Sequence, residues 1–80
     1  MEKTSKRIRN ISVWYDKEGD YLELTLKKSK DTYFDEIRKD IAKIIDKRSN
    51  KVVGYAVFNF TKKKQQEKEL IFPIPEEILN

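Results

Sequence analysis

Three acidic side chains at alternate positions form the first group in this sequence whose type and spacing could do chemistry. Asp16, Glu18 and Asp20 make a D-x-E-x-D pattern, which is similar to the start of a calcium-binding loop. The glycine in the middle of such a loop and the bidentate glutamate at its end are missing here. We therefore predict no bound metal, and a solvated turn in which Asp16 and Asp20 accept hydrogen bonds from the local backbone.

The sequence contains no pair of carboxylates suited to general acid and base catalysis. The other carboxylate pairs, Asp35 with Glu36 and Glu76 with Glu77, are adjacent along the chain and so point in different directions. The chain contains no His and no Cys, which excludes imidazole and thiol nucleophiles and the zinc and iron-sulfur sites built on those ligands. We predict a protein that is not an enzyme, with no catalytic residue and no cofactor.

Clustered basic side chains are a second chemical feature, because Lys and Arg bind phosphate groups and release counterions. The residues that would contact a nucleic acid are Lys6, Arg7, Arg9, Lys62, Lys63 and Lys64. Trp14 and Tyr21 could stack on bases. Acidic residues are interleaved with the basic ones, however, and no helix-turn-helix, RNP or zinc motif is present. Nucleic-acid binding is therefore the alternative hypothesis, weighed against a role of these charges in solubility and edge protection.

Chain length and composition predict one small domain over residues 1–80. The chain has a net charge of +4 and 40% charged residues, yet its Ile, Leu, Val and Phe content exceeds the roughly 20% below which charged chains stay disordered. A domain of this size buries only about 60 to 65% of its unfolded surface, so disulfides, metals or self-association often supplement the core. Because Cys and His are absent, we expect a homodimer.

The N-terminal sequence MEKTSKRIRN lacks the apolar run of a signal peptide. The sequence also has no stretch of about 18 apolar residues that would span a membrane. We expect a cytoplasmic protein with no membrane partner, in which residues 1–9 form a basic N-terminal arm.

Apolar residues alternate with period two over residues 8–26, which predicts two strands joined by the turn D-K-E-G-D. A register that pairs Tyr15 with Leu22 collects the apolar side chains on one face. That face contains Ile11, Val13, Tyr15, Leu22, Leu24 and Leu26. We expect it to be buried, and we expect Gly19 to take the left-handed conformation that closes the turn.

Two interpretations are open for residues 32–47. Phe and Ile residues recur there at helical spacing, and Thr32 with Asp35 resembles a capping box, so the pattern alone favours a helix. Against the helix, the short Ile-rich stretch 41–45 precedes the turn-like sequence D-K-R-S-N-K and the apolar segment 52–60. This second arrangement is typical of a hairpin.

The segment 52–60 is apolar on both of its expected faces. In an unbroken strand one face holds Val53, Tyr55 and Val57, and the other holds Val52, Ala56, Phe58 and Phe60. Such a strand lies at the centre of a sheet or has its second face covered. The surplus apolar surface predicts a protein interface formed by Trp14, Tyr55, Phe58 and Phe60. The alternative is that the C-terminal tail, residues 70–79, folds back over this surface.

The last twenty residues are expected to add little regular structure. Residues 61–68 form a polar loop in this prediction, and residues 69–80 form a C-terminal edge segment. Pro73 and Pro75 each remove a backbone donor, so we predict an edge strand over 69–72 and a final helical turn that starts at Pro75.

The motifs W-Y-D-K-E-G-D-Y-L-E-L and I-I-D-K-R-S-N-K-V-V-G-Y-A-V-F-N-F resemble those of a family of short prokaryotic proteins. That family is catalogued as domain of unknown function twenty-two eighty-three, and the resemblance extends over residues 11–62. Its motif positions are Tyr15, Asp16, Asp20, Asp46, Val52, Val53 and Gly54. Asn50 stands near the usual Gly of the second turn and can take the same left-handed conformation. The Glu common after Val-Val-Gly is replaced by Tyr55 and Ala56.

The resemblance implies a small antiparallel sheet, and on that ground we predict strand for Ile41–Asp46. It implies no activity, although members are often encoded beside small predicted toxins. We therefore predict a mainly β domain, α+β at most. It is a single antiparallel β-meander sheet of four to five strands with a short C-terminal helical turn. The leading function is a non-enzymatic protein-interaction module, with a small cognate toxin as the partner that the resemblance suggests.

Overall fold

The computed structural model of this protein describes residues 10–74, which form a five-stranded antiparallel sheet and a short helix. The elements are β1 (Ser12–Asp16), β2 (Tyr21–Thr25), β3 (Thr32–Arg38), β4 (Ile41–Asp46), β5 (Val52–Phe58) and α2 (Phe60–Gln66). The predicted mainly β fold is confirmed. The expected final helical turn from Pro75 and the basic arm 1–9 lie outside the described residues.

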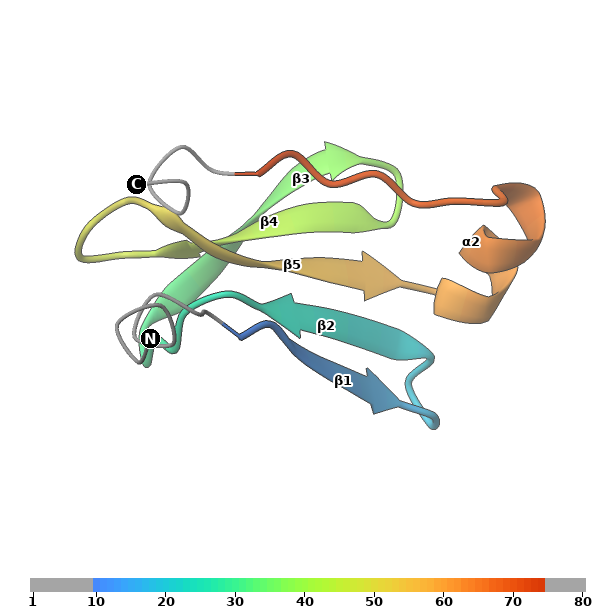
Figure 1. Ribbon diagram of the computed structural model, residues 1–80, viewed down its shortest axis with the longest axis horizontal. Helices are drawn as coiled ribbons and strands as arrows, with labels where there is room; N and C mark the ends of the chain where they lie inside the picture. The colour runs from blue at the N-terminus through green and yellow to red at the C-terminus, as the bar shows by residue number, and fades with distance from the viewer. Residues whose placement is uncertain (1–9, 75–80) are drawn as a thin grey trace, which may run out of the picture.

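The strand order corrects the meander prediction. The sheet runs β1-β2-β5-β4-β3, so the chain crosses from β2 to the far edge before β5 returns to the middle (Figure 1). The physical reason is the composition of β5, whose residues from Val53 to Val57 are all buried. A strand that is apolar on both faces gains most from a central place with a neighbour on each side.

Residues 32–47, for which the sequence allowed either a helix or a hairpin, contain two strands. β3 and β4 form a hairpin, with Phe34 opposite Ile44 and Asp35 opposite Lys43. Asp40 in the tight turn between them has a left-handed backbone, with φ of 67°. The prediction of strand for Ile41–Asp46 is confirmed. β4 pairs with β3 on one side and β5 on the other, and its isoleucines are buried.

The first hairpin has the predicted register, with Tyr15 opposite Leu22 and Val13 opposite Leu24. Its turn differs in one respect, because Asp20 rather than Gly19 takes the left-handed backbone, with φ of 52°. In the second turn Asn50 adopts φ of 60°, as expected for a residue that replaces Gly there.

A β-bulge breaks the alternation of β5. Ile44 pairs with Gly54, but the next residue of β4, Ile45, pairs with Val52, so Val53 is the extra residue. Val53 accordingly packs with Ile44 and Ala56, and the prediction that it shares a face with Tyr55 is wrong. At Gly54 an added Cβ would lie 2.4 Å from the Leu24 carbonyl oxygen, so β2 and β5 can approach only with Gly here.

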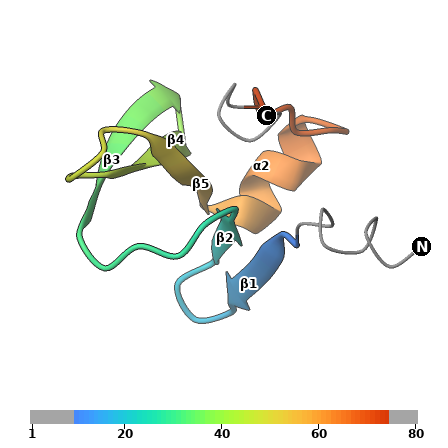
Figure 2. The ribbon, with the colours of Figure 1, turned by 60° about the vertical axis from the view of Figure 1, so that its left-hand side comes forward.

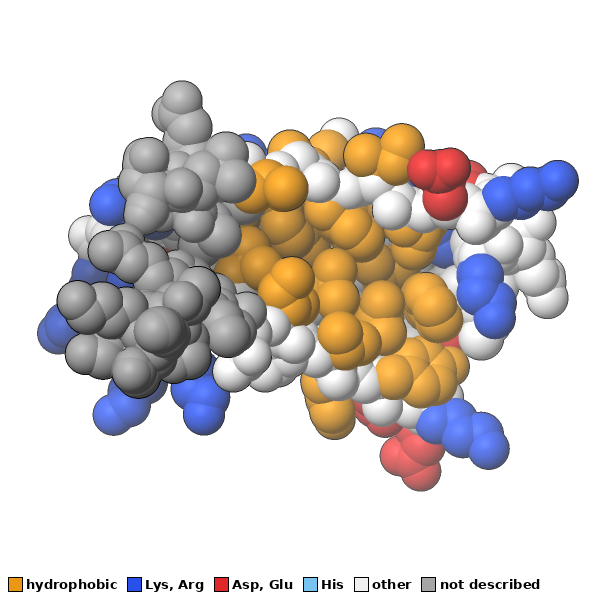
Figure 3. Space-filling view, in the orientation of Figure 1, with side chains coloured by type: hydrophobic (Ala, Val, Ile, Leu, Met, Phe, Trp, Pro, Cys, Tyr) orange, Lys and Arg blue, Asp and Glu red, His pale blue; other side chains and the backbone are white. Residues whose placement is uncertain are grey.

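The two faces of the sheet have different surroundings. The tail face, which carries Leu22, Tyr55 and Val57, is covered at one end by α2 and along β4 and β3 by residues 67–74 (Figures 1 and 2). Tyr55 contacts Phe72, with ring centroids 5.1 Å apart, and donates a hydrogen bond to the Pro73 carbonyl. Figure 3 shows hydrophobic side chains gathered over the middle of the sheet, between this tail and β1.

Two predictions for the C-terminal part are wrong. Most of the expected polar loop is helix α2, because Lys and Gln are good helix formers and the hydrogen bonds described below anchor its first turn. The expected edge strand at 69–72 is instead an extended segment without strand pairing, and it contacts a face of the sheet through Phe72. Of the predicted interface residues the described part of the tail therefore contacts Tyr55, whereas Trp14 and Phe58 lie on the opposite face of the sheet.

Burial is greatest in β4 and β5, where Ile41 and Val57 are completely buried. By contrast, Val13 in β1 keeps 62% of its surface exposed, so the expectation that the apolar face of the first hairpin is buried is wrong at β1. No helix within residues 10–74 has the length and apolar character needed to cross a membrane.

Candidate functional site

Four aromatic side chains cross the second face of the sheet from one edge to the other. Trp14 of β1 contacts Tyr21 of β2 with ring centroids 5.9 Å apart, and Tyr21 contacts Phe58 of β5 at 5.2 Å. Phe34 of β3 completes the row, 5.8 Å from Phe58. We call these four residues the aromatic row and the surface that carries them the aromatic face.

The period of two and the strand order bring these residues together. Asp16 is paired with Tyr21 and Tyr21 with Phe58, so Trp14, two residues before Asp16, projects on the same side. Phe34 reaches Phe58 across β4, where the intervening side chain at Ala42 is small. Few atoms therefore fill the centre of this face.

The two ends of the row are the most exposed aromatic side chains among the described residues. Trp14 is 55% and Phe34 is 49% exposed, whereas Tyr21 and Phe58 are half-buried. Aromatic rings exposed in this way at both edges of a sheet offer a large apolar contact area at low conformational cost.

Shallow hollows flank the row. One, of about 250 Å³, lies beside Phe34 and Phe58 and has Ala42 in its lining. Another, of about 160 Å³, lies between Phe34 and the end of β2, where Ile44, Val53 and Thr25 contribute to its wall. Polar side chains also line both hollows, among them Glu23 and Lys27 in the smaller one and Glu36 and Asp40 in the larger one. The aromatic face is thus an uneven surface, apolar along the row and polar beside it, that could receive side chains of a partner.

The Glu23 carboxylate lies beside Tyr21 of the aromatic row. Glu23 accepts a hydrogen bond from the Tyr21 hydroxyl at 2.8 Å and another from the Thr25 hydroxyl at 3.3 Å. Burial, together with the hydrogen bond to Glu23, raises the pKa of Tyr21 above its ordinary value, so the phenol stays protonated and donates. Glu23 is consequently a fixed acceptor whose remaining lone pairs suit a donor or a cation on a partner.

Asp20 is bound to a distant segment rather than to its own turn. Its carboxylate accepts hydrogen bonds from the Thr61 backbone N–H at 3.1 Å and the Thr61 hydroxyl at 2.8 Å, and from the Tyr15 hydroxyl at 2.9 Å. Asn59 at the start of α2 makes no side-chain cap, so Asp20 supplies the acceptor for the first turn of the helix. Desolvation raises the pKa of Asp20, but these hydrogen bonds outweigh it, and the pKa lies below its ordinary value.

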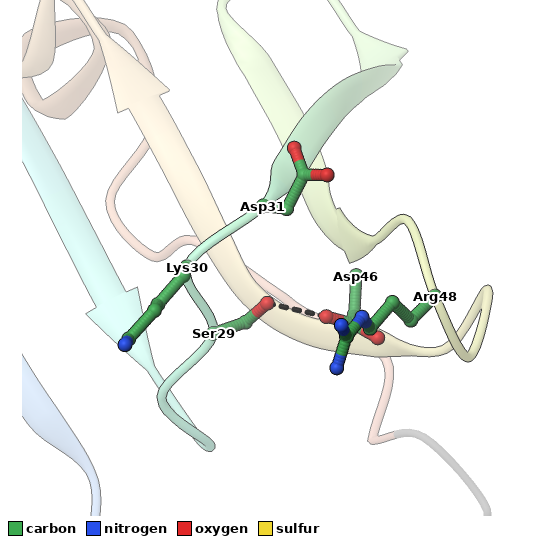
Figure 4. A pocket seen from close by; sticks show the side chains of 5 residues that line it. All are labelled: Ser29, Lys30, Asp31, Asp46 and Arg48. Atoms are coloured by element: carbon green, nitrogen blue, oxygen red, sulfur yellow. Dashed lines mark hydrogen bonds between the residues drawn. The ribbon is translucent and has the colours of Figure 1, made fainter.

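Asp46 makes a similar connection at the other end of the sheet, in a polar pocket of about 450 Å³ (Figure 4). Its carboxylate accepts hydrogen bonds from the Ser29 hydroxyl and from the Ser49 hydroxyl and backbone N–H. The hydrogen bond from Ser29 is the largest cause that lowers the pKa of Asp46 to about 2. The carboxylate thereby joins the crossing segment after β2 to the turn after β4.

These two carboxylates have structural partners, and the D-x-E-x-D turn assembles no metal site. The prediction that Asp20 accepts hydrogen bonds from the local backbone is wrong, since its backbone donor, Thr61, lies 41 residues away. Within residues 10–74 no group of three or more acidic side chains is arranged to hold a metal ion. The sequence offered no signal for the contact between Asp20 and Thr61, which depends on the tertiary fold.

The predicted interface residues are divided between the two faces. Trp14 and Phe58 belong to the aromatic row, whereas Tyr55 lies on the tail face against Phe72. Phe60 starts α2 and contacts Tyr15, with ring centroids 5.6 Å apart. The predicted interface omitted Phe34, although its pairing with Ile44 in a hairpin register would have placed it on the face of Ala42 and Ile44.

The basic residues proposed for nucleic-acid contact do not form one surface. Lys63 is buried and pairs with Glu67 at 3.0 Å, while Lys64 lies 5.9 Å from the centre of the Phe60 ring and Lys62 is exposed. The other three members of that set fall in residues 1–9, outside the described part of the chain. A different group, Lys27, Lys28 and Lys30, lines hollows that also contain Glu23.

The residues that carry the family resemblance have clear structural roles, because Asp20 and Asp46 connect distant segments and Gly54 permits the β2–β5 contact. The resemblance itself stays a prediction. Comparison of the chain with models of known protein families, with curated proteins and with solved structures found no match.

Proposed function

We propose that this protein is a non-enzymatic protein-interaction module that binds a partner protein on its aromatic face. The observation that carries the proposal is the continuous aromatic row, whose two ends, Trp14 and Phe34, are about half exposed. Tyr, Trp and Phe are enriched in the cores of protein interfaces and among the residues that dominate binding energy. The flanking hollows give this face the relief that side chains of a partner would fill.

The charges around the row support a protein partner better than a nucleic acid. Glu23 lies in the surface beside Tyr21, and Glu36 and Asp40 line the hollow next to Phe34. Fixed carboxylates would repel the phosphates of a strand whose bases stacked on the row. A partner peptide with apolar side chains and a Lys or Arg directed at Glu23 fits the same surface.

Nucleic-acid binding is the second candidate, favoured by one observation. Lys27, Lys28 and Lys30 line hollows at the end of the aromatic face, and exposed aromatic rings beside lysines are typical of single-strand binding surfaces. Salt separates the two candidates, because a complex held by phosphate contacts weakens steeply between roughly 50 and 200 mM salt.

Capture of a partner protein from a lysate of the host cells, with this chain immobilised, tests the proposal. The wild-type chain and the variant Phe34→Ser are compared with Ile71→Ser, a control in the tail that removes a side chain of 65% exposure away from the aromatic row. We expect a protein retained by wild type and by Ile71→Ser after nuclease treatment and at 200 mM salt, and lost with Phe34→Ser. Equal retention by all three chains would refute the assignment of this face. Retention of nucleic acid alone would favour the second candidate.

The antitoxin role is the finer proposal, and it rests on the family resemblance. Such a protein would mask the toxin that is encoded beside it, and the aromatic face is the surface that we assign to that contact. Co-expression with the neighbouring small protein tests it. Wild type should restore growth and Phe34→Ser should not, whereas no effect of wild type on growth would contradict the antitoxin role while leaving the interaction module testable by capture.

A further inference from the structure

We infer that two copies of this chain pair through their β1 strands and form one continuous antiparallel sheet. The inference is independent of what binds the aromatic face. It rests on three features of β1, namely its position, its side chains and its self-complementary register.

β1 is an edge strand of the sheet that residues 10–74 form, and no strand of that part of the chain pairs with its outer side. Within residues 10–74 it pairs with β2 alone, and it forms one end of the strand order (Figure 1). The outward N–H and C=O groups of such an edge are a template for another strand. Natural edges are protected by Lys, Pro, bulges or charged side chains, and SVWYD contains none of these until its last residue, Asp16.

The side chains of β1 are exposed on both faces of the sheet. Val13 and Tyr15 are 62% and 40% exposed on the tail face, and Trp14 is 55% exposed on the aromatic face. Isolated apolar residues are common on surfaces, but three consecutive ones on an open edge are an association site. A strand paired along β1 would bury side chains on both faces at once.

The sequence of β1 suits pairing with itself. Five residues make the strand, so an antiparallel arrangement centred on Trp14 pairs every one of them. Trp14 then lies opposite Trp14 of the second chain, and Val13 lies opposite Tyr15. Ser12 lies opposite Asp16, whose carboxylate can accept a hydrogen bond from the serine hydroxyl. No like charges are opposed in this register, and the aromatic row continues from one chain into the other across the paired tryptophans.

The other edge of the sheet lacks this property, which is why we assign the contact to β1. Self-pairing of β3 about its central residue would place Asp35 against Asp35, and like charges directly opposite each other are unfavourable. β3 also contains a register shift between Glu36 and Arg38, and bulges discourage strand addition. The two edges therefore differ in charge and in regularity.

Introducing a charge at Trp14, on the proposed two-fold axis, tests the inference. The mass of each chain is measured by sedimentation equilibrium at tens of micromolar. Wild type should show about twice the chain mass of 9.6 kDa. Trp14→Lys alone and Trp14→Glu alone should each sediment as monomers, because each places like charges face to face. An equimolar mixture should return to about twice the chain mass, since the opposite charges then meet.

Phe34→Lys is the matched control, because it introduces the same charge at a ring of similar exposure on the opposite edge. This variant should remain a dimer. A monomeric wild type would overturn the inference, as would a Trp14→Lys chain that stays dimeric or a Phe34→Lys chain that dissociates. Failure of the mixture to reassociate would overturn the register centred on Trp14.

Two further variants keep the test decisive if the Trp14 substitutions unfold the hairpin. Val13→Lys changes a side chain on the tail face of the same strand, away from Tyr21, and should also produce monomers. The chain contains no Cys, so Trp14→Cys should form a disulfide-linked dimer under mild oxidation, whereas Phe34→Cys should not. Equal cross-linking of both cysteine variants would contradict the pairing through β1.

Discussion

β1 and β5 are both predicted as strands from their apolar residues but have opposite environments. Both are short apolar stretches with β-branched and aromatic residues. Val57 in β5 is completely buried, whereas Val13 in β1 keeps 62% of its surface exposed. The difference shows that apolar alternation identifies a strand and its faces without determining how deeply the strand is buried.

Neighbouring elements account for the difference. β5 pairs with β2 on one side and β4 on the other, and Tyr55 is covered by the tail. β1 pairs only with β2 among the described residues, and Tyr15 contacts α2 through Phe60 at one end of the strand. Sheet position and cover therefore decide burial, and the exposed side of β1 is the surface that we assign to a second copy.

Truncation of buried and exposed apolar side chains provides the largest test of this comparison. Ile41→Ala, opposite Val57 in the centre, should lower the free energy of unfolding by about 2 to 5 kcal/mol through lost transfer energy and a cavity. Val13→Ala should lower it by well under about 1 kcal/mol in the monomer. Urea denaturation at sub-micromolar concentration measures both values, and similar losses would contradict the contrast in burial.

Gly54 tests how closely the two hairpins approach each other. Gly54→Ala places a Cβ 2.4 Å from the Leu24 carbonyl oxygen, and the required shift of β2 should cost about 1 to 3 kcal/mol. Gly19→Ala is the matched control, because the atom nearest to its new Cβ is a side-chain oxygen of Asp16 at 3.1 Å, which can move. Equal denaturation midpoints for the two variants would show that β2 is free to adjust.

Substitution of Asp20 tests whether its carboxylate connects the first hairpin to the start of α2. Asp20→Gly fits the left-handed backbone and removes the acceptor of the Thr61 N–H, so the amide of Thr61 should exchange faster with solvent. Asp20→Asn, which also tolerates this backbone and keeps an amide oxygen, should change the rate less. Hydrogen exchange followed by NMR measures the effect, and unchanged protection in Asp20→Gly would show that the helix start needs no such acceptor.

Asp46 gives the smallest expected effect, a change in acid sensitivity. Its folded-state pKa of about 2 lies below the ordinary 3.8, so its ionised form stabilises the fold. This contribution is complete above about pH 4 and is lost as the pH falls through the folded pKa. Asp46→Asn should therefore flatten the loss of stability between about pH 4 and pH 2, as measured by urea midpoints. A parallel pH dependence in wild type and variant would contradict the role of the Ser29 and Ser49 hydrogen bonds.

The aromatic row was predictable only in part. The sequence predicts Trp14 and Phe58 as interface residues, because the chain has more apolar surface than one face of a small sheet can bury. Their grouping with Phe34 depends on the crossing that brings β3 to the far side of β5. Tyr55 and Phe60 were assigned to the same interface because the sequence does not show which side the tail and α2 cover.

The sequence by itself determined the two strands of the first hairpin and their register, the left-handed turn at Asn50 and the need of Val52–Phe58 for a central or covered position, whereas for residues 32–47 its pattern favoured a helix. These features depend on side-chain period and on the backbone preferences of neighbouring residues, which are local. Tertiary structure decided the strand order, the bulge at Val53, the start of α2 at Asp20 and the exposure of β1. Each of these depends on contacts between residues far apart in the chain, and no local pattern records which distant segment will supply the neighbour.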